Sequence, residues 1–481
     1  MAEALDALTP RSVWGHFASL AAIPRPSKHE EKAVAFVTEV TERAGASVVR
    51  DRRGNVVARV PASRGRERAP TVILQTHLDM VGEKNKDVAH DFEKDPIHPR
   101  VDGEWVRATG TTLGADNGIG VAAALAAATD PAVVHGPLEL LFTLDEETGL
   151  TGASELDPKV LTGRLLLNLD SEEDGTIFVG CAGGEDTIIA LPVSWTAPTG
   201  DAFRLEVSGL KGGHSGLNIV ENRGNALKLL ARILDAAVEA GVAVEVASIA
   251  GGSKHNAIPR EAEAALCGDR AALTSVAEKS LAAFRTELAG IDDGLTVTVG
   301  DAGRPERVLT RADRDRLLRL LMALPHGVLA MSRDIPGLVE TSSNLAVVAV
   351  RGNAFHIATS SRSSIASSLT GVLDGIRAQA RLAGATFERK DGYPGWKPNL
   401  DSKALAVVRS VYAKRWGKEP HVTAIHAGLE CGLLGERVPG LDMVSFGPQI
   451  EGAHSPDERV NVPSVARFWG ALGEVLDRLS S

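Results

Sequence analysis

The chain of 481 residues is longer than one hydrophobic core usually supports, and 44% hydrophobic with 24% charged residues is an ordinary globular composition. A formal net charge of -10 argues against nucleic acids and anionic membranes, which favour basic surfaces, so we expect neither as a partner. Three cysteines far apart, at positions 181, 267 and 431, and the lack of an apolar run long enough to span a membrane predict a disulfide-free protein of the cytoplasm.

Helix and strand signals alternate over residues 1–190, the first part of a predicted discontinuous α/β domain. In chain order they are an amphipathic helix at 30–45, a hairpin at 46–62, a buried strand at 69–81, a glycine-rich turn and helix at 110–131, and strands near 136–144 and 163–169 that run into acidic residues. Such alternation indicates a sheet with parallel members, in which functional side chains collect at the carboxyl ends of the strands.

The pattern changes over residues 191–394, which we predict to form an inserted α+β domain. Two sets of elements follow the order β-α-β-β-α-β of a ferredoxin-like unit. The first set lies within 201–302, and the second begins at a helix over 311–324, followed by strands at 337–350 and 354–360, a helix at 364–383 and a strand at 385–389. A tandem pair of such units is therefore expected.

Residues 395–481 return to α/β character and complete the first domain. The return follows a glycine- and proline-rich linker at 392–398. Helices are predicted at 402–417 and 464–480, with strand and turn signals at 421–434 and 441–448 between them. The fold class expected is thus a discontinuous α/β domain with a mixed sheet, interrupted by the α+β insertion.

Histidine and acidic residues recur where strands of the α/β domain end, at His77, Asp79, Asp116, Glu146, Glu147, Asp170 and His454. Each has an ordinary structural interpretation by itself: a surface pair for His77 and Asp79, an acidic turn for Glu146 and Glu147, and a helix N-cap for Asp116. Their coincidence in one domain favours a metal site. Histidine and carboxylate ligands without cysteine suit zinc, manganese or cobalt.

Charge counting predicts how such a site is shared. If Asp116 bridges two divalent ions, one ion takes Glu147 and a histidine, and the other takes Asp170 and the other histidine. The three carboxylates neutralise three of the four positive charges of the two ions, and a bridging hydroxide neutralises the fourth. Such a pair of ions polarises a carbonyl and supplies a nucleophile at neutral pH. Glu146 is then left over as the general base.

The spacing of His77 and Asp79 gives them a joint role. Residues i and i+2 of a strand point to the same face, so the two side chains are expected to lie together. Asp79 would accept the second ring N–H of His77, which fixes the tautomer of a metal-bound imidazole and raises its basicity.

The order of these motifs resembles that of a known family. The chain resembles the di-zinc dipeptidase, aminoacylase and carboxypeptidase family, nearly end to end, in the segments THLDMV, GTTLGADNGIG, LDEETGLTGA, LLNLDSEE, GLKGGHSG, NAIPREA and GPQIEGAHSPDERV. More narrowly, it is similar to the aminoacyl-histidine dipeptidases (Xaa-His dipeptidases, peptidase D) in IHAGLECGLL and GAHSPDERVNV. The resemblance implies a catalytic domain, residues 1–190 and 395–481, and a lid domain, residues 191–394.

The resemblance also implies a metal centre and its ligands. Two Zn²⁺ ions, with Mn²⁺ or Co²⁺ as substitutes, would be held by His77, Asp116, Glu147, Asp170 and His454, with Asp116 bridging. Glu146 would activate the bridging water and later protonate the leaving amine, and Asp79 would orient His77. A cis peptide would follow the bridging aspartate, at Asp116–Asn117.

The lid would supply groups that contact the substrate. His214, in a glycine-flanked loop, is implied to stabilise the oxyanion, and neighbouring His255 next to Asn256 is the alternative for that role. Asn256 and Arg362 are candidates to hold the substrate, with the arginine on its terminal carboxylate. His426 and Glu430, in IHAGLECG, are proposed to recognise the free α-amine.

The predicted function is that of a metal-dependent dipeptidase. It would act on small dipeptides with a free amino terminus and favour Xaa-His, including carnosine-like β-alanyl-histidine, as a monomer or a homodimer. The histidine preference comes from the family alone. Two alternatives stay open: an N-acyl-amino-acid deacylase or aminotripeptidase of the same family, and a non-catalytic metal- or peptide-binding protein with a decayed site, which would need a missing ligand or base.

Overall fold

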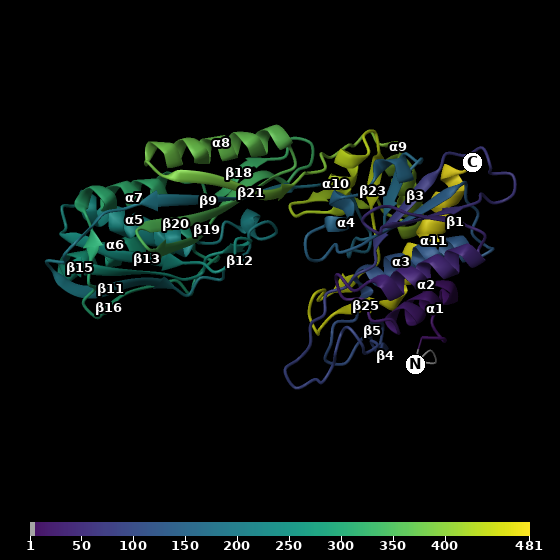
Figure 1. Cartoon of the computed structure of the whole chain (residues 1–481), viewed down its shortest axis with the longest axis horizontal. Coiled ribbons are helices and arrows are strands. Elements are labelled where there is room, and N and C mark those ends of the chain that lie inside the picture. The colour runs from purple at the N-terminus through teal and green to yellow at the C-terminus, as the bar shows by residue number, and fades with distance from the viewer. Residues whose placement is uncertain (1–4) are drawn as a thin grey trace. The chain divides into compact units, whose positions relative to one another are not determined.

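The computed structural model describes residues 5–481, which divide into two compact units. Unit 1 runs to Gly180 and resumes over Trp396–Ala424 and Leu429–Ser481. Unit 2 spans Cys181–Gly395 and takes in the short segment Ile425–Gly428. It begins before residue 191, where the sequence suggested a boundary. Figure 1 labels many of the elements of both units, which are described separately below.

Unit 1 is built on an eight-stranded sheet in the order β1-β2-β6-β3-β7-β23-β8-β22. Its strands are β1 (Ser47–Arg50), β2 (Val56–Val60), β3 (Val72–His77), β6 (Leu138–Thr143), β7 (Leu165–Asn168), β8 (Thr176–Cys181), β22 (His421–Ile425) and β23 (Asp442–Ser445). β3 pairs in parallel with β6 and β7, and β7 pairs in parallel with β23. β1 and β2 form the antiparallel hairpin predicted at 46–62. The mixed α/β sheet is confirmed.

Helices and a small second sheet complete unit 1. The helices are α1 (Arg11–Ala21), α2 (Glu31–Arg43), α3 (Ala115–Thr129), α4 (Thr151–Ser154), α9 (Lys403–Trp416), α10 (Glu430–Arg437) and α11 (Val462–Leu479). The second sheet has the order β24-β25-β5-β4 and consists of β4 (Arg100–Asp102), β5 (Trp105–Arg107), β24 (Ile450–Glu451) and β25 (Arg459–Asn461). The turn between β24 and β25 carries His454.

The burial of the central elements of unit 1 explains the residue types found in them. Every residue of β3 is buried, as expected for a parallel strand covered on both faces. α3 packs against β3 and α1, and its alanines and glycines allow the close approach. A Cβ at Gly120 would lie 2.6 Å from the carbonyl oxygen of Leu169, just beyond β7. The start of α3 is therefore held tightly against the carboxyl ends of the strands.

Unit 2 contains a nine-stranded sheet with the path β16-β11-β15-β13-β19-β20-β9-β21 and β18 paired to β19. Its strands are β9 (Gly183–Pro192), β11 (Asp201–Ser208), β13 (Val244–Gly251), β15 (Ala262–Gly268), β16 (Thr296–Asp301), β18 (Gly327–Met331), β19 (Val339–Arg351), β20 (Ala354–Ser363) and β21 (Thr386–Tyr393). Its helices are α5 (Ala226–Glu239), α6 (Arg270–Glu287), α7 (Arg311–Ala323) and α8 (Ala366–Leu382). One hydrophobic core lies between the sheet and all of these helices.

Both halves of this sheet have ferredoxin-like strand order, but they are nested instead of following one another. β11, α5, β13, β15, α6 and β16 form the inner half, whose strands lie in the order β16-β11-β15-β13. The outer half begins with β9, before the inner half, and continues with α7, β19, β20, α8 and β21. The expectation of two successive units missed β9, because the boundary at residue 191 cut through it. β10 (Trp195–Thr196) and β17 (Val308–Leu309) pair where the chain enters and leaves the inner half.

Two short strands of unit 2 form a hairpin outside its main sheet. β12 (Gly213–His214) pairs with β14 (Ala257–Ile258), so that His214 is directly opposite Ala257. The hairpin brings together the GLKGGHSG and HNAIP segments, which are distant in sequence. The positions of His214 and Asn256 are therefore fixed by one structural element.

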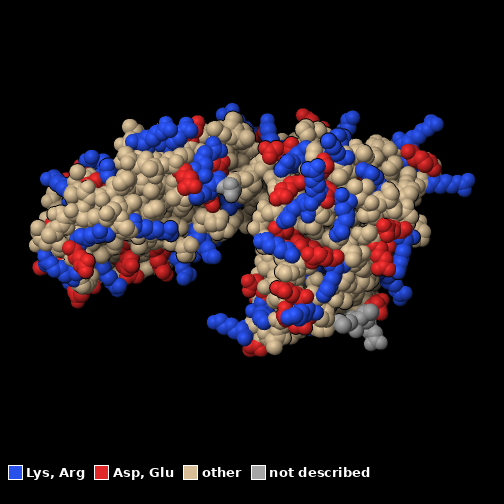
Figure 2. Space-filling model, viewed as in Figure 1, with Lys and Arg blue, Asp and Glu red and all other residues tan. Residues whose placement is uncertain are grey.

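Within residues 5–481, no helix has both the length and the apolarity needed to cross a bilayer. On the face drawn in Figure 2, basic and acidic side chains are interspersed instead of forming one large basic surface.

Candidate metal centre

Three neighbouring parallel strands carry the predicted ligands to one edge of the unit 1 sheet. His77 is the last residue of β3, Glu146 and Glu147 follow the end of β6, and Asp170 follows β7. β3 lies between β6 and β7 in the sheet, so the carboxyl ends of all three strands meet. This edge is where side chains from separate parts of an α/β chain converge.

Asp116 lies at the centre of two groups of candidate metal ligands. Its Oδ1 is 3.1 Å from Nε2 of His77, and that nitrogen is 3.4 Å from Oδ1 of Asp170. Its Oδ2 is 3.1 Å from Nε2 of His454, which lies 3.0 Å from Oε2 of Glu147. One carboxylate therefore contributes an oxygen to each group, and the two histidines are divided between Asp170 and Glu147.

The residues present fit two divalent cations. Within each group, the ligand atoms lie within 4.8 Å of one another. Oε1 of Glu147 and Oδ1 of Asp170 are buried and have no hydrogen-bond partner among the described residues. The donor atoms are all imidazole nitrogen or carboxylate oxygen, as zinc and the other borderline or hard divalent cations prefer.

The backbone has uncommon conformations at two of the candidate ligands, Asp116 and His454. The Asp116–Asn117 peptide is cis, as the resemblance implied, and both residues have non-helical dihedral angles at the start of α3. His454 has a φ of 62°, in the left-handed region that side chains other than glycine rarely adopt. A left-handed conformation of a residue such as His454 persists where surrounding contacts hold it, and such residues concentrate at functional sites.

Asp79 contacts one residue from each of the two groups, His77 and Glu147. It lies beyond the end of β3, not within the strand as the spacing suggested, yet its Oδ1 is 3.3 Å from Nδ1 of His77. It also accepts hydrogen bonds from the backbone N–H groups of Glu146 and Glu147, at 3.0 and 3.1 Å, and from Ser27. Burial raises the pKa of Asp79, but the contacts with His77 and these donors outweigh burial and lower the pKa to about 2.

The closely spaced histidines and carboxylates of the centre shift one another's pKa values. Hydrogen bonds to Asp116 and Glu147 raise the pKa of His454 to about 11. Burial raises the pKa of Asp170 to about 7, and the neighbouring carboxylates add to this increase. A proton therefore competes for the positions that a metal ion takes, because a ligating imidazole must be neutral and a ligating carboxyl ionised.

Glu146 is next to the ligands but outside both groups around Asp116. One of its oxygens lies within 4.8 Å of ligand atoms of His77 and Glu147. Burial raises its pKa well above the usual value, and the charges of Asp170, Glu430 and Glu147 increase it further. Glu430 is itself buried, and its Oε2 accepts hydrogen bonds from Gln75 and Thr143 at 2.6 and 2.7 Å.

Sequence reasoning missed two buried residues that support the centre. Arg25 donates hydrogen bonds to the carbonyl oxygens of Leu78 and Asp79 at 2.8 Å and to that of Gly114. Glu458 accepts hydrogen bonds from the backbone N–H groups of Ala115 and Asp116. The segment HSPDE contains Glu458, but no periodicity or spacing distinguishes it from an exposed acidic residue.

His214 of unit 2 has a defined tautomer. Its Nδ1 accepts hydrogen bonds from the N–H groups of Gly216 and Leu217, at 3.2 and 3.1 Å, so the ring proton must be on Nε2. Burial and the nearby Arg362 guanidinium lower its pKa to about 4, which keeps the ring neutral at pH 7. His214 is therefore a neutral N–H donor.

The other predicted residues of unit 2 are placed as follows. Nη1 of Arg362 donates a hydrogen bond to the Tyr393 hydroxyl at 2.5 Å, and Nε2 of His426 lies 2.8 Å from Oγ of Ser342. Asn256 is exposed, and its backbone oxygen accepts a hydrogen bond from Ser215. Nδ1 of the exposed His255 lies 2.6 Å from Oδ2 of Asp186.

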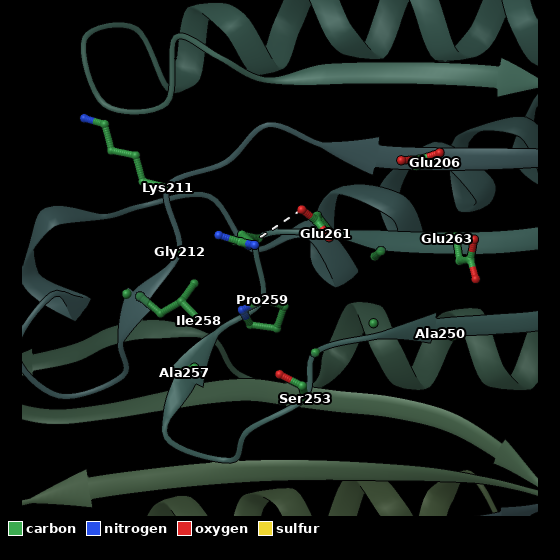
Figure 3. A pocket seen from close by; sticks show the side chains of 15 residues that line it. Glu206, Lys211, Gly212, Ala250, Ser253, Ala257, Ile258, Pro259, Glu261 and Glu263 are labelled. Atoms are coloured by element: carbon green, nitrogen blue, oxygen red, sulfur yellow. Dashed lines mark ion pairs between the residues drawn. The ribbon is translucent and has the colours of Figure 1, made fainter. Parts of the chain in front are cut away.

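Each unit also has a surface cavity. Figure 3 shows one of about 720 Å³ in unit 2, which lies beside the hairpin of β12 and β14 and has Glu206, Lys211, Glu261 and Glu263 among its polar walls. A cavity of about 900 Å³ in unit 1 is lined by Glu147, together with Met80 and Phe92. Of these two cavities, the one in unit 1 is therefore lined by a proposed metal ligand.

A family profile, a sequence relative and a solved structure that match this chain are all those of peptidases. The sequence profile of peptidase family M20/M25/M40 matches residues 73–478. The cytosol non-specific dipeptidase of Escherichia coli (strain K12) is 44% identical over 480 residues, which cover 99% of each chain. The crystal structure of aminoacylhistidine dipeptidase from Vibrio alginolyticus superposes with a TM-score of 0.92 at 42% identity, over 98% of each chain. An aminopeptidase from Bacillus cereus, at 16% identity and a TM-score of 0.58, shares the fold.

Proposed function

The chain belongs to peptidase family M20/M25/M40, and we propose that it is a dipeptidase that hydrolyses dipeptides with a free amino terminus at a centre of two divalent cations. The observation that carries the proposal is the Asp116 carboxylate, whose two oxygens lie in two separate groups of ligands. The names of the relatives from E. coli and V. alginolyticus support dipeptides as substrates. The E. coli name also supports a cytoplasmic location.

The proposed ligands are His77 and Asp170 for one cation, Glu147 and His454 for the other, and Asp116 for both. When bound, two such cations polarise the scissile carbonyl and make a water nucleophilic at neutral pH. Zinc is the proposed metal, with Mn²⁺ or Co²⁺ as substitutes, because the ligands are nitrogen and oxygen atoms only.

The chain's own residues would then move the protons. We propose that the Glu146 carboxylate accepts a proton from the attacking water and delivers it to the leaving amine. Its position next to Glu147 and outside the two ligand groups supports this role. Asp79 holds the backbone of Glu146 and Glu147 by two hydrogen bonds, so it would fix both the base and a ligand.

His214 is the proposed oxyanion donor, because its neutral ring carries a proton on Nε2. Replacing it with alanine is expected to lower kcat by roughly 100-fold or more, as the loss of an oxyanion donor does. Steady-state kinetics of His214→Ala would measure this change. His255→Ala is the matched control, since it removes an exposed imidazole from the same region. An unchanged kcat in His214→Ala, or an equal loss in His255→Ala, would contradict the proposal.

Arg362 is the proposed partner of the substrate carboxylate. Its guanidinium is buried, and its Nε has no hydrogen-bond partner among the described residues, so it retains a donor for a ligand. A planar guanidinium suits a carboxylate. The predicted contacts of Asn256 with the substrate, and of His426 and Glu430 with its amine, stay predictions, as does the choice between monomer and homodimer.

The substrate class is tested by comparing Ala-His with its N-acetyl form. We expect rapid hydrolysis of Ala-His and little or none of the blocked peptide, with product formation followed by chromatography. Turnover of the blocked peptide alone would make the chain a deacylase, and a preference for Ala-Ala-His would make it a tripeptidase. Because one relative is called non-specific and the other acts on aminoacylhistidine by name, we propose broad activity with an Xaa-His preference, which Ala-Leu beside Ala-His measures.

A further inference from the structure

The carboxylate of Glu458 accepts hydrogen bonds from four successive backbone N–H groups. Its Oε2 accepts from Leu113 and Gly114, at 2.7 and 2.9 Å, and its Oε1 accepts from Ala115 and Asp116, at 2.7 and 3.2 Å. Glu458 is buried, with 2% of its surface exposed. The two oxygens of a carboxylate together offer enough acceptor positions for four such donors.

The same loop is held from its other side by Arg25. The guanidinium donates to the carbonyl oxygen of Gly114 and to those of Leu78 and Asp79, which follow β3. A Cβ at Gly114 would lie 2.7 Å from Nη2 of Arg25, and Gly114 has a φ of +71°, so glycine is required there. The peptide between Gly114 and Ala115 therefore has hydrogen-bond partners for both its C=O and its N–H group.

Glu458 also belongs to the segment that supplies a ligand. It follows His454 in the turn between β24 and β25, and its own N–H donates to the carbonyl oxygen of Ser455. Movement of this turn would consequently displace a ligand of one cation and, through the four hydrogen bonds, the shared ligand of both.

We propose that Glu458 is a positioning residue of the metal centre, which holds the backbone of residues 113–116 so that the two oxygens of Asp116 face two separate cations. The inference rests on the proposed function only in that it requires cations at this site. It assigns Glu458 no contact with metal or substrate.

The test is the zinc affinity of Glu458→Gln, measured on metal-free protein by competition with a chromophoric chelator. Glutamine keeps the size of the side chain but replaces one acceptor oxygen with an NH₂ donor. Two of the four backbone N–H groups would then face a donor and lose their acceptor. We expect zinc affinity to fall by roughly 10- to 100-fold, the usual range for residues that orient ligands.

Glu139→Gln is the matched control. Glu139 is also buried, near the start of β6, and accepts hydrogen bonds from the backbone of Thr162 and Gly163. It lies at the opposite end of β6 from Glu146, so its loss should lower the Tm of the metal-free protein while zinc affinity stays within about twofold of the wild type. Equal zinc affinities in Glu458→Gln and Glu139→Gln would overturn the proposal.

A second pair of variants covers the case in which Glu458→Gln does not fold. Glu458→Asp keeps the charge but is one methylene shorter, so we expect an affinity between those of the wild type and Glu458→Gln, and Glu139→Asp serves as its control. An affinity for Glu458→Asp equal to that of Glu139→Asp would then overturn the proposal. The titrations contain no peptide, so a protein that binds zinc but cleaves no dipeptide would contradict the proposed function alone.

Discussion

Glu146→Ala is expected to lower kcat for Ala-His by several orders of magnitude while both metal ions stay bound. General acid–base catalysis contributes roughly 10²–10⁴-fold, and Glu146 would act twice, on the attacking water and on the leaving amine. Its carboxylate lies beside Glu147, yet the two groups of ligands around Asp116 are complete without it. Steady-state kinetics and metal analysis of the same preparation would measure both quantities.

Metal content distinguishes a base from a ligand at this position. An oxygen of Glu146 also lies within 4.8 Å of His77 and Glu147, so loss of a metal ion in Glu146→Ala would make Glu146 a ligand. Full activity would remove the proposed base and favour a different catalytic group. Glu155→Ala is the control, because Glu155 is an exposed carboxylate just beyond α4.

Asp116→Ala is expected to weaken the binding of both cations and to reduce hydrolysis below detection. The reason is that its two oxygens serve different groups of ligands, 3.1 Å from His77 on one side and 3.1 Å from His454 on the other. His454→Ala removes a ligand from one group only, so it should retain one tightly bound ion. Metal analysis after dialysis against a weak chelator would measure the two occupancies. Equal metal contents in the two variants would show that Asp116 is not shared.

Much of the centre could be predicted because its residues lie at the ends of recognisable strands. His77 is the last residue of β3, Glu147 and Asp170 follow β6 and β7, and the parallel order of those strands brings the three residues to one edge. Counting charges predicted a division of metal ligands around Asp116, and the structure places Asp170 next to His77 and Glu147 next to His454. The histidine paired with each carboxylate could not be predicted, because it depends on the turn after β24, far along the chain.

The contacts missed by sequence reasoning share a physical reason. Glu458 and Arg25 bind backbone groups, which every residue has, so no complementary side chain in the sequence marks their partners. Asp79 was predicted to face His77 from within a strand. It makes the contact from beyond the strand end, where the alternation of faces no longer applies. The nested order of unit 2 was hidden because β9 lies at the predicted boundary and its partners follow much later.

That nesting has a consequence for the nascent chain. β9 leaves the ribosome before the inner half of unit 2, but both strands that flank it, β20 and β21, are made after that half is complete. Pairing between strands so distant in sequence is slow to form, whereas the inner half can assemble from neighbouring elements. Until β20 and β21 have been made, β9 consequently exposes two unpaired edges, which are open to pairing with the wrong strand.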